Sequence, residues 1–389
     1  MAAVARAQPA RAANALSRRQ AERRQIAQPV RALVGAADFA AQAAGLAHTL
    51  AAGPLPLAAG GLAAAGLASL VPPPPAGLRE PVSVSLEGGK APLNTHGVGR
   101  GGKFPPFQGK VLAIERMGGR DAERDVSRIV IETGGVLFHE GQSFGVVPPG
   151  TKINSKGQEV PETVRLYSIA SSRYGDRHDG KTCTLCVVRV VWHDEEGKVH
   201  RGVCSNYLCD LKVGDTIQMT GPSGTAMLLP DNHMQRRIVC VATGTGIAPF
   251  RAFWRRLFFD QVPGHPHGYQ GRFWLLAGFA NPDSELFTKE LRSIEAANPD
   301  HFRLDVALSL TQTNQRGGPE YVQDRIEESG EEFLALLASD DCLFYFCGLK
   351  RMYSSVVEVL ERLGEERGVD TKALIAKLKK EHRWHVETA

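Results

Sequence analysis

The sequence predicts two domains of different fold class, an antiparallel β-barrel followed by an α/β domain with a parallel sheet. A chain of 389 residues is too long for one ordinary hydrophobic core. Residues 109–229 hold short β-branched runs separated by Gly and Pro turns, as in antiparallel barrels. From residue 237, strand-like runs alternate with amphipathic stretches, the pattern of repeated βα units. The predicted domains are 104–230 and 236–389.

The N-terminal 78 residues have a composition unlike the rest. Residues 1–31 contain seven arginines and a single acid, Glu22, which is typical of an organelle transit peptide. Residues 39–78 carry no formal charge and are rich in Ala, Gly and Pro. A low-complexity linker is favoured over a membrane tether or a second targeting segment. We therefore expect a transit peptide and linker over 1–78 and a flexible segment over 79–103.

The charge of the remaining chain argues against a polyanion as partner. The formal net charge is +4, but residues 32–389 hold 39 basic and 41 acidic residues. A nearly neutral body offers no support for nucleic-acid binding.

The elements of the first domain follow from its turn residues. Gly134-Gly135, Pro148–Gly150 and Gly221-Pro222 separate the apolar runs. Examples of the expected strands are 109–115, 127–132, 165–171, 183–192 and 215–220, and one helical stripe is expected at 205–211.

The second domain is expected to alternate strands and helices. The first strand, 237–242, leads into a helix whose apolar face carries Phe250, Phe253, Trp254, Leu257 and Phe258. The further expected strands are 272–279, 302–309 and 342–347, the further helices are 284–297, 320–338, 352–367 and 371–381, and 384–387 is a short tail.

Seven cysteines include a Cys183-x-x-Cys186 pair that invites a zinc or redox interpretation. The pair lies in an apolar β-branched run, where strand geometry puts positions 183 and 186 on opposite faces. Structural cysteines are therefore favoured, and no metal site is expected.

Four motifs carry candidate chemistry. The first is the run 243–249 (TGTGIAP), between a strand and a helix. Its glycines permit a tight turn, and the helix start offers free N–H groups to a pyrophosphate. The pattern is GxGxxP rather than GxGxxG, and such turns often have no ligand.

The second motif is the strand 165–172 (RLYSIASS). Arg165, Tyr167 and Ser168 on one strand can together bind a flavin, although an ordinary half-buried strand has the same composition.

The third motif is 202–208 (GVCSNYL), in which Ser205 is expected to cap a helix. That helix start either binds a second phosphate of the cofactor or is only a structural helix cap.

The fourth motif is 347–350 (CGLK), at the C-terminal end of a strand, where ligands of open α/β sheets bind. The thiol of Cys347 either packs against a nicotinamide ring or is a buried core cysteine.

Taken together in this order, RLYSIASS, GVCSN, GPSG, ATGTGIAPFR, FCGLK and a terminal WHVE resemble the plant-type ferredoxin–NADP reductases, especially those of green algae. The resemblance covers residue 104 to the end. It implies a six-stranded FAD barrel over 104–230, a five-stranded parallel sheet for NADP(H) over 236–389, and non-covalent FAD.

The resemblance also implies site residues. The reacting centre would be surrounded by Ser168, Cys347 and Glu387, where hydride is transferred at FAD N5. The FAD positions would be Arg165, Leu166, Tyr167, Ser168, Cys186, Val187, Val188, Trp192, Val203, Cys204 and Ser205. The nucleotide positions would be Thr243, Phe279, Ala280, Ser309, Tyr321, Gln323, Gly348 and Leu349.

Several positions depart from the pattern of that family, and most remove a cation. The family usually has Lys or Arg where this chain has Val188, Thr225, Leu310 and Pro319. The family also usually ends in tyrosine, where this chain has Ala389. NADP(H) is therefore the implied nucleotide, with NAD(H) as an open alternative.

The expected function is a flavin-dependent oxidoreductase that moves electrons between reduced ferredoxin and NADP⁺/NADPH in photosynthetic electron transport. The alternatives are a diverged reductase that prefers NADH and a flavin-binding subunit without turnover. The expected partner is ferredoxin or a similar acidic carrier, bound by basic clusters at 100–103, 251–256 and 377–380. The expected location is the chloroplast, in the stroma or at the stromal face of the thylakoid.

Overall fold

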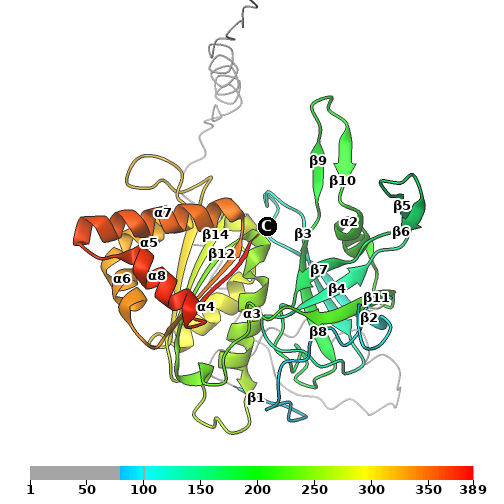
Figure 1. Ribbon diagram of the computed structural model, residues 1–389, viewed down its shortest axis with the longest axis horizontal. Coiled ribbons are helices and arrows are strands. Elements are labelled where there is room, and N and C mark those ends of the chain that lie inside the picture. Colours follow the sequence, from blue (N-terminus) through cyan, green and yellow to red (C-terminus); the bar gives the residue numbers. More distant parts are fainter. Residues whose placement is uncertain (1–78, 100, 389) are drawn as a thin grey trace, which may run out of the picture. The chain divides into compact units, whose positions relative to one another are not determined.

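The computed structural model describes residues 79–99 and 101–388 (Figure 1). The transit peptide and linker predicted over 1–78 lie outside the described residues. Within the described residues, no helix is both long and apolar enough to cross a bilayer.

Six antiparallel strands form the sheet of the first domain, in the order β7-β4-β11-β2-β3-β8. These strands are β2 (Phe107–Met117), β3 (Val126–Glu132), β4 (Ser143–Val147), β7 (Arg165–Ser168), β8 (Thr182–Val188) and β11 (Thr216–Ser223). A bridge between Ile169 and Leu185 joins the two outer strands, so the sheet closes on itself. The interior is filled by apolar side chains such as Ile129, Phe144 and Met219. This confirms the predicted six-stranded barrel.

Two hairpins and one helix extend from the barrel (Figure 1). They are β5 (Thr151–Ile153) with β6 (Glu159–Pro161), β9 (Val191–His193) with β10 (Val199–Arg201), and α2 (Val203–Asp210). The single strand expected over 183–192 is thus two strands with a break after Val188. The expected cap at Ser205 is wrong, because the helix begins at Val203 with Gly202 as its N-cap. The Ser205 hydroxyl instead accepts a hydrogen bond from the backbone N–H of Val190 at 3.2 Å.

Five parallel strands form the sheet of the second domain, in the order β15-β14-β12-β16-β17. They are β12 (Arg237–Thr243), β14 (Phe273–Phe279), β15 (Phe302–Leu308), β16 (Cys342–Gly348) and β17 (Trp384–Thr388). Side chains of β12 alternate between two cores, with Ile238 and Cys240 in one and Val239 and Val241 in the other. A parallel sheet buried on both faces confirms the predicted α/β class.

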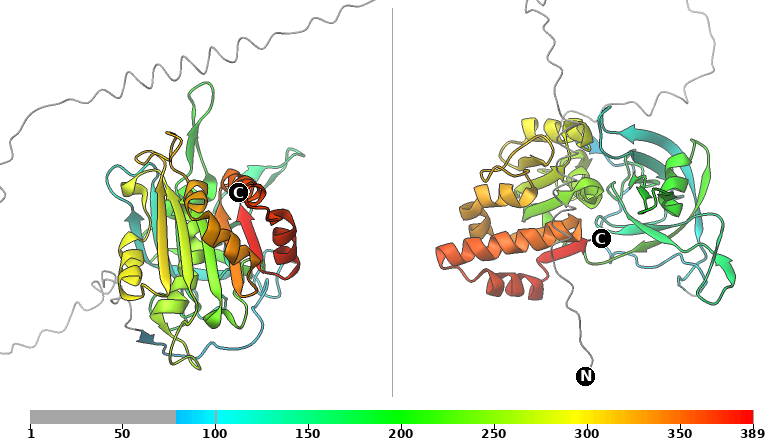
Figure 2. Two further views of the ribbon diagram at one scale, coloured as in Figure 1. Left: turned by 90° about the vertical axis from the view of Figure 1, so that its left-hand side faces the viewer. Right: turned by 90° about the horizontal axis from the view of Figure 1, so that it is seen from above.

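Helices cover both faces of this sheet (Figure 2). One face packs against α3 (Ala248–Trp254) and α4 (Thr288–Ala297). The other packs against α5 (Val322–Glu328), α6 (Gly330–Ala338), α7 (Lys350–Arg367) and α8 (Thr371–Lys380). Short turns complete the domain, namely η1 (His233–Gln235), η2 (Gly244–Ile247), the π-helical η3 (Arg255–Phe259) and η4 (Pro282–Ser284).

Two predicted elements of this domain need correction. The helix expected over 320–338 is broken at Ser329 into α5 and α6, and Gly330 packs against Leu363 of α7, where an added Cβ would lie 3.2 Å from the leucine methyl groups. The expected tail at 384–387 is the fifth strand, β17, hydrogen-bonded in parallel register to β16. A run of four residues is too short for a periodic pattern to identify it as a strand.

The segment before the barrel also differs from expectation. A flexible stretch was predicted over 79–103, but its described part makes specific contacts. Strand β1 (Glu80–Pro81) pairs with β13 (Asp260–Gln261), and Glu87 accepts hydrogen bonds from both terminal nitrogens of Arg256 at 3.0 and 2.6 Å. Such contacts to distant residues leave no periodic signal in the sequence.

Candidate active site

The C-terminal ends of the parallel strands gather most of the predicted nucleotide positions. Strands β12, β14 and β16 end at Thr243, Phe279 and Gly348. The backbone N–H of Leu349 donates to the Thr243 hydroxyl at 3.1 Å, and the N–H of Ser309 donates to the carbonyl of Phe279 at 3.0 Å. These residues therefore form one edge, the place where open α/β sheets bind ligands.

The glycine turn η2 is packed tightly against this edge. Gly244 has a φ of +53°, and a Cβ added at Gly246 would lie 2.2 Å from the carbonyl oxygen of Cys347. A side chain at position 246 would therefore push the turn away from β16. The glycines thus have a packing role, which also brings the turn beside Cys347 and Gly348.

Cys347 and Glu387 are paired across the neighbouring strands β16 and β17. Burial raises the pKa of the Cys347 thiol to about 12, with a further contribution from the Glu387 charge. Burial also raises the pKa of Glu387. At neutral pH the edge therefore presents an uncharged thiol beside Glu387, which is exposed at the surface but has a raised pKa because its carboxyl group is partly desolvated.

The barrel presents a second group of predicted residues on β7 and α2. Burial raises the pKa of the Tyr167 hydroxyl on β7, and the neighbouring Cys204 thiol of α2 adds to this shift. Arg165 is part-exposed, and its guanidinium donates to the backbone carbonyl of Thr163 at 2.6 Å. Ser168, at the end of β7, is half-buried.

Two positions of the barrel group are buried, on opposite faces of β8. Val187 is 1% exposed and lies in the barrel interior, so only its backbone could contact a cofactor. Cys186 is buried on the outer face of β8, in the same core as Cys347. The barrel interior also contains Cys183. The two thiols of the CxxC pair thus point to opposite faces of one strand, as strand geometry predicts.

Similarity to known proteins identifies the family. Residues 127–227 match the oxidoreductase FAD-binding domain, and residues 240–358 match the oxidoreductase NAD-binding domain. The chloroplastic ferredoxin–NADP reductase of Chlamydomonas reinhardtii is 49% identical over 311 residues, which cover 79% of this chain and 85% of that protein. The chain belongs to the ferredoxin–NADP reductase family.

Other members of the ferredoxin–NADP reductase family give the same result. The chloroplastic embryo isozyme of Oryza sativa subsp. japonica is 47% identical over 287 residues, covering 72% of this chain and 75% of that protein. The solved ferredoxin–NADP⁺ reductase of Plasmodium falciparum with 2′P-AMP superposes with a TM-score of 0.57 at 27% identity, covering 73% of this chain and 96% of that one.

Several of the predicted FAD positions are exposed apolar side chains on β7, α2 and the β9–β10 hairpin. Leu166, Trp192 and Val203 are large apolar side chains that are 61%, 49% and 47% exposed. Exposed apolar and aromatic groups next to a guanidinium suit a planar ring system joined to phosphates. Trp192 stands on the β9–β10 hairpin, where its ring stacks on His200 with centroids 5.2 Å apart. The residues present are therefore compatible with FAD.

The remaining nucleotide positions lie in the segments that follow β15 and β16 at the same sheet edge, and Leu310 adjoins them. Leu310, Tyr321 and Leu349 are 69%, 48% and 63% exposed, and the N–H of Leu310 donates to the carbonyl of Ala280 at 2.7 Å. Gln323 is half-buried in the first turn of α5. Exposed aliphatic and aromatic groups in this place suit stacking against a base. Val188, where family members usually have a cation, is half-buried at the end of β8.

One predicted partner surface is wrong. The cluster 251–256 was expected to attract an acidic protein, but the side chains of Arg251, Arg255 and Arg256 are only 4%, 5% and 3% exposed. They point into the boundary between the two domains. Of the other clusters, Lys103, Lys379 and Lys380 are exposed, and Arg100 lies outside the described residues.

The sequence analysis missed the acidic partners of these arginines. Asp176, Glu140 and Glu290 are buried and paired with them. A signal was present, because the run 250–259 (FRAFWRRLFF) is mostly apolar, with large side chains on both sides of its arginines. Such a helix is buried, and its arginines must then be paired.

Proposed function

We propose that this chain transfers electrons between a ferredoxin-type one-electron carrier and NADP(H), with residues 104–230 binding FAD and residues 236–389 binding the nucleotide. The pairing of Cys347 with Glu387 at the strand ends carries this proposal. Cys347 shares one buried core with Ala170 and Cys186 of the barrel. The edge that would hold the nicotinamide therefore meets the strands that would hold the flavin.

Each residue of the proposed site has a distinct task. Bound FAD accepts electrons singly and passes them on as a hydride. Arg165 would pair with the phosphates, Tyr167 would pack on the ring system, and Ser168 would offer a hydroxyl next to it. Cys347 would orient the nicotinamide by contact, and Glu387 would hold a proton close to the reacting atoms.

An anaerobic titration tests the proposal. The purified protein should carry flavin absorbance that bleaches on addition of NADPH, and the reduced protein should pass electrons to ferredoxin. A flavin spectrum that neither NADPH nor NADH bleaches would contradict the proposal and favour the subunit without turnover.

For the partner, we propose an acidic electron carrier held by exposed lysines such as Lys103, Lys379 and Lys380. Pairing between exposed charges weakens as salt shortens the Debye length to about 10 Å or less. Binding to ferredoxin should therefore weaken from low to moderate ionic strength, and binding that is indifferent to salt would contradict an electrostatic surface.

For the location, we propose the chloroplast stroma or the stromal face of the thylakoid, reached through a transit peptide within residues 1–78. The curated relatives named above are chloroplastic. A fluorescent fusion to residues 1–78 should enter chloroplasts. Fractionation would then distinguish stroma from thylakoid, and a fusion that stays outside chloroplasts would contradict the proposal.

A further inference from the structure

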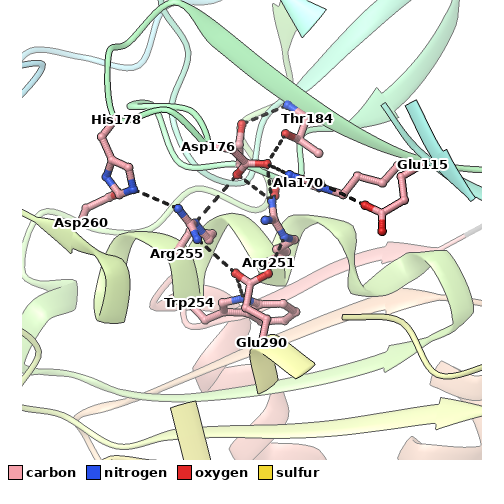
Figure 3. A network of polar contacts seen from close by, with 12 residues as sticks. Glu115, Ala170, Asp176, His178, Thr184, Arg251, Trp254, Arg255, Asp260 and Glu290 are labelled. Carbon is pink, nitrogen blue, oxygen red and sulfur yellow. Dashed lines mark hydrogen bonds and ion pairs between the residues drawn. The ribbon is translucent and has the colours of Figure 1, made fainter. Parts of the chain in front are cut away.

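Arg251 joins the two domains through a single buried guanidinium (Figure 3). One of its terminal nitrogens donates to the carbonyl oxygen of Ala170 at 2.6 Å and to a carboxylate oxygen of Asp176 at 2.9 Å. Its Nε donates to a carboxylate oxygen of Glu290 at 3.1 Å. One side chain therefore holds a barrel carbonyl, a barrel carboxylate and a carboxylate from α4 at once.

Both ends of this connection lie close to the proposed reacting centre. On the barrel side, Ala170 follows Ser168 by two residues, and its own N–H donates to the carbonyl of Thr184 at 2.7 Å. On the α/β side, Arg251 stands in α3, directly after the glycine turn η2 that packs against Cys347. The contact thus links the strand that would hold the flavin to the turn that would hold the nucleotide.

The partners of Arg251 are themselves held in place. Asp176 also accepts a hydrogen bond from the Thr184 hydroxyl at 2.8 Å, and Glu290 accepts one from the Trp254 indole at 3.1 Å. Burial alone would raise the pKa of Asp176, but the charges of Arg251 and its neighbouring arginines outweigh this and hold that pKa well below its ordinary value. The carboxylate therefore stays charged and keeps its hold on the guanidinium.

The geometry requires arginine rather than any cation. Arg251 uses two different nitrogens of its planar group to reach acceptors on two domains. A lysine has one compact ammonium group and cannot span both sets of acceptors in the same way.

We propose that Arg251 is a positioning residue that sets how closely the nucleotide edge approaches the flavin strand. The inference rests on the proposed function. Hydride transfer needs the reacting atoms about 3–3.5 Å apart, and a displacement of about 1 Å can lower the rate about 100-fold. Loosening the contact between Ala170 and α3 should therefore slow hydride transfer while leaving each binding surface intact.

The test compares Arg251→Lys with the matched control Arg256→Lys. Arg256 lies in the π-helical turn that follows α3 and is equally buried, but it holds Glu87 of the N-terminal segment and approaches Glu140 of the barrel at 3.9 Å, rather than holding the strand end after Ser168. Both variants keep the positive charge and should lower the Tm similarly. Anaerobic stopped-flow reduction by NADPH should be about 10- to 100-fold slower in Arg251→Lys and within about twofold of the parent in the control.

A second readout does not depend on turnover. Stacking of nicotinamide on flavin gives a long-wavelength charge-transfer absorbance, which should weaken in Arg251→Lys while the FAD content and the Kd of NADP⁺ stay within about twofold of the parent. If Arg251→Lys does not fold, Asp176→Asn tests the same contact from the barrel side and should show the same loss of rate and absorbance.

Two outcomes would overturn the inference. One is an unchanged reduction rate in Arg251→Lys or in Asp176→Asn, and the other is an equal loss in the Arg256→Lys control. If the parent protein is itself not reduced by NADPH or NADH, the proposed function fails, and that failure is distinct from either outcome.

Discussion

Replacing Leu310 with arginine should increase the preference of this reductase for NADPH over NADH. Leu310 follows Ser309 at the nucleotide edge and is 69% exposed. Cations nearby in the loop are already engaged, because Arg316 is paired with Glu327 and Arg325 is paired with Glu320 and Glu328. A 2′-phosphate bound here would therefore find hydroxyl and aromatic groups but no unengaged guanidinium among these residues.

The size of the effect follows from the exposure of the site. A charge-assisted hydrogen bond contributes about 1.5–3 kcal/mol. Because position 310 is mostly exposed, water screens a new charge, and the lower end of that range applies. About 1.5 kcal/mol corresponds to about a tenfold change in preference. By the same arithmetic, the two cations that the family usually has, replaced here by Leu310 and Pro319, would account for about a hundredfold or more.

The assay is kcat/KM for both nucleotides with an artificial electron acceptor. Leu310→Gln is the matched control, since it has a long polar side chain without charge. The parent protein should use NADPH with weak discrimination against NADH, Leu310→Arg should gain about tenfold for NADPH, and Leu310→Gln should gain little. A parent preference above about 10³-fold would refute the reasoning, as would equal gains in the two variants.

Three further predictions concern the flavin, the reacting centre and the domain boundary. Arg165→Glu should lose FAD during purification, because a carboxylate would replace the cation beside the phosphates; stoichiometric flavin in that variant would show that the site is elsewhere. Cys347→Ala and Glu387→Ala should slow flavin reduction far more than they weaken FAD binding, as stopped-flow and spectral titration would measure; unchanged reduction rates in both would remove these residues from the reacting centre. Burial alone would raise the pKa of the Glu140 carboxyl, but the charges of Arg173 and Arg256 outweigh burial and lower this pKa below its ordinary 4.5. The ionised carboxylate therefore stabilises the fold above pH 4.5, and this stabilisation is lost as the pH falls. Glu140→Gln should therefore cost about 3–5 kcal/mol in urea unfolding at pH 7 and less at pH 4; an equal cost at both pH values would contradict that explanation.

The parts of the fold that the sequence predicted are those with local periodic signals. The barrel strands, the βα units and the turn 243–249 each depend on neighbours in the chain, and the structure contains them. Strand β17 and the break at Ser329 were missed, because each depends on packing against a distant element, β16 in one case and α7 in the other.

The candidate site follows the same rule: residues in local motifs were predicted from the sequence, and residues held by distant partners were not. Motifs and family resemblance located Thr243, Phe279, Gly348 and Cys347, which the structure places on one edge of the sheet. The role of Arg251 was misjudged, because a basic residue on a helix normally faces water. Arg251 is buried instead, because it pairs with Asp176 of the barrel and Glu290 of α4. These acids lie 75 and 39 residues away in the chain, so no local pattern indicates the pairing.

The buried side chains of Arg251, Arg255 and Arg256 also affect whether the two domains can be separated or exchanged between proteins. A cut in the chain between residues 230 and 236 would separate Asp176 from Arg251 and Glu140 from Arg256, and would leave each acid with one barrel arginine, Arg128 or Arg173. Each acid would lose one of its cations, and the α/β fragment would expose the arginines of α3 and η3 that now pair with the barrel. Protein engineers who exchange nucleotide domains among flavoenzymes would therefore have to transplant the acids together with the helix, because the boundary here is a shared core rather than a linker.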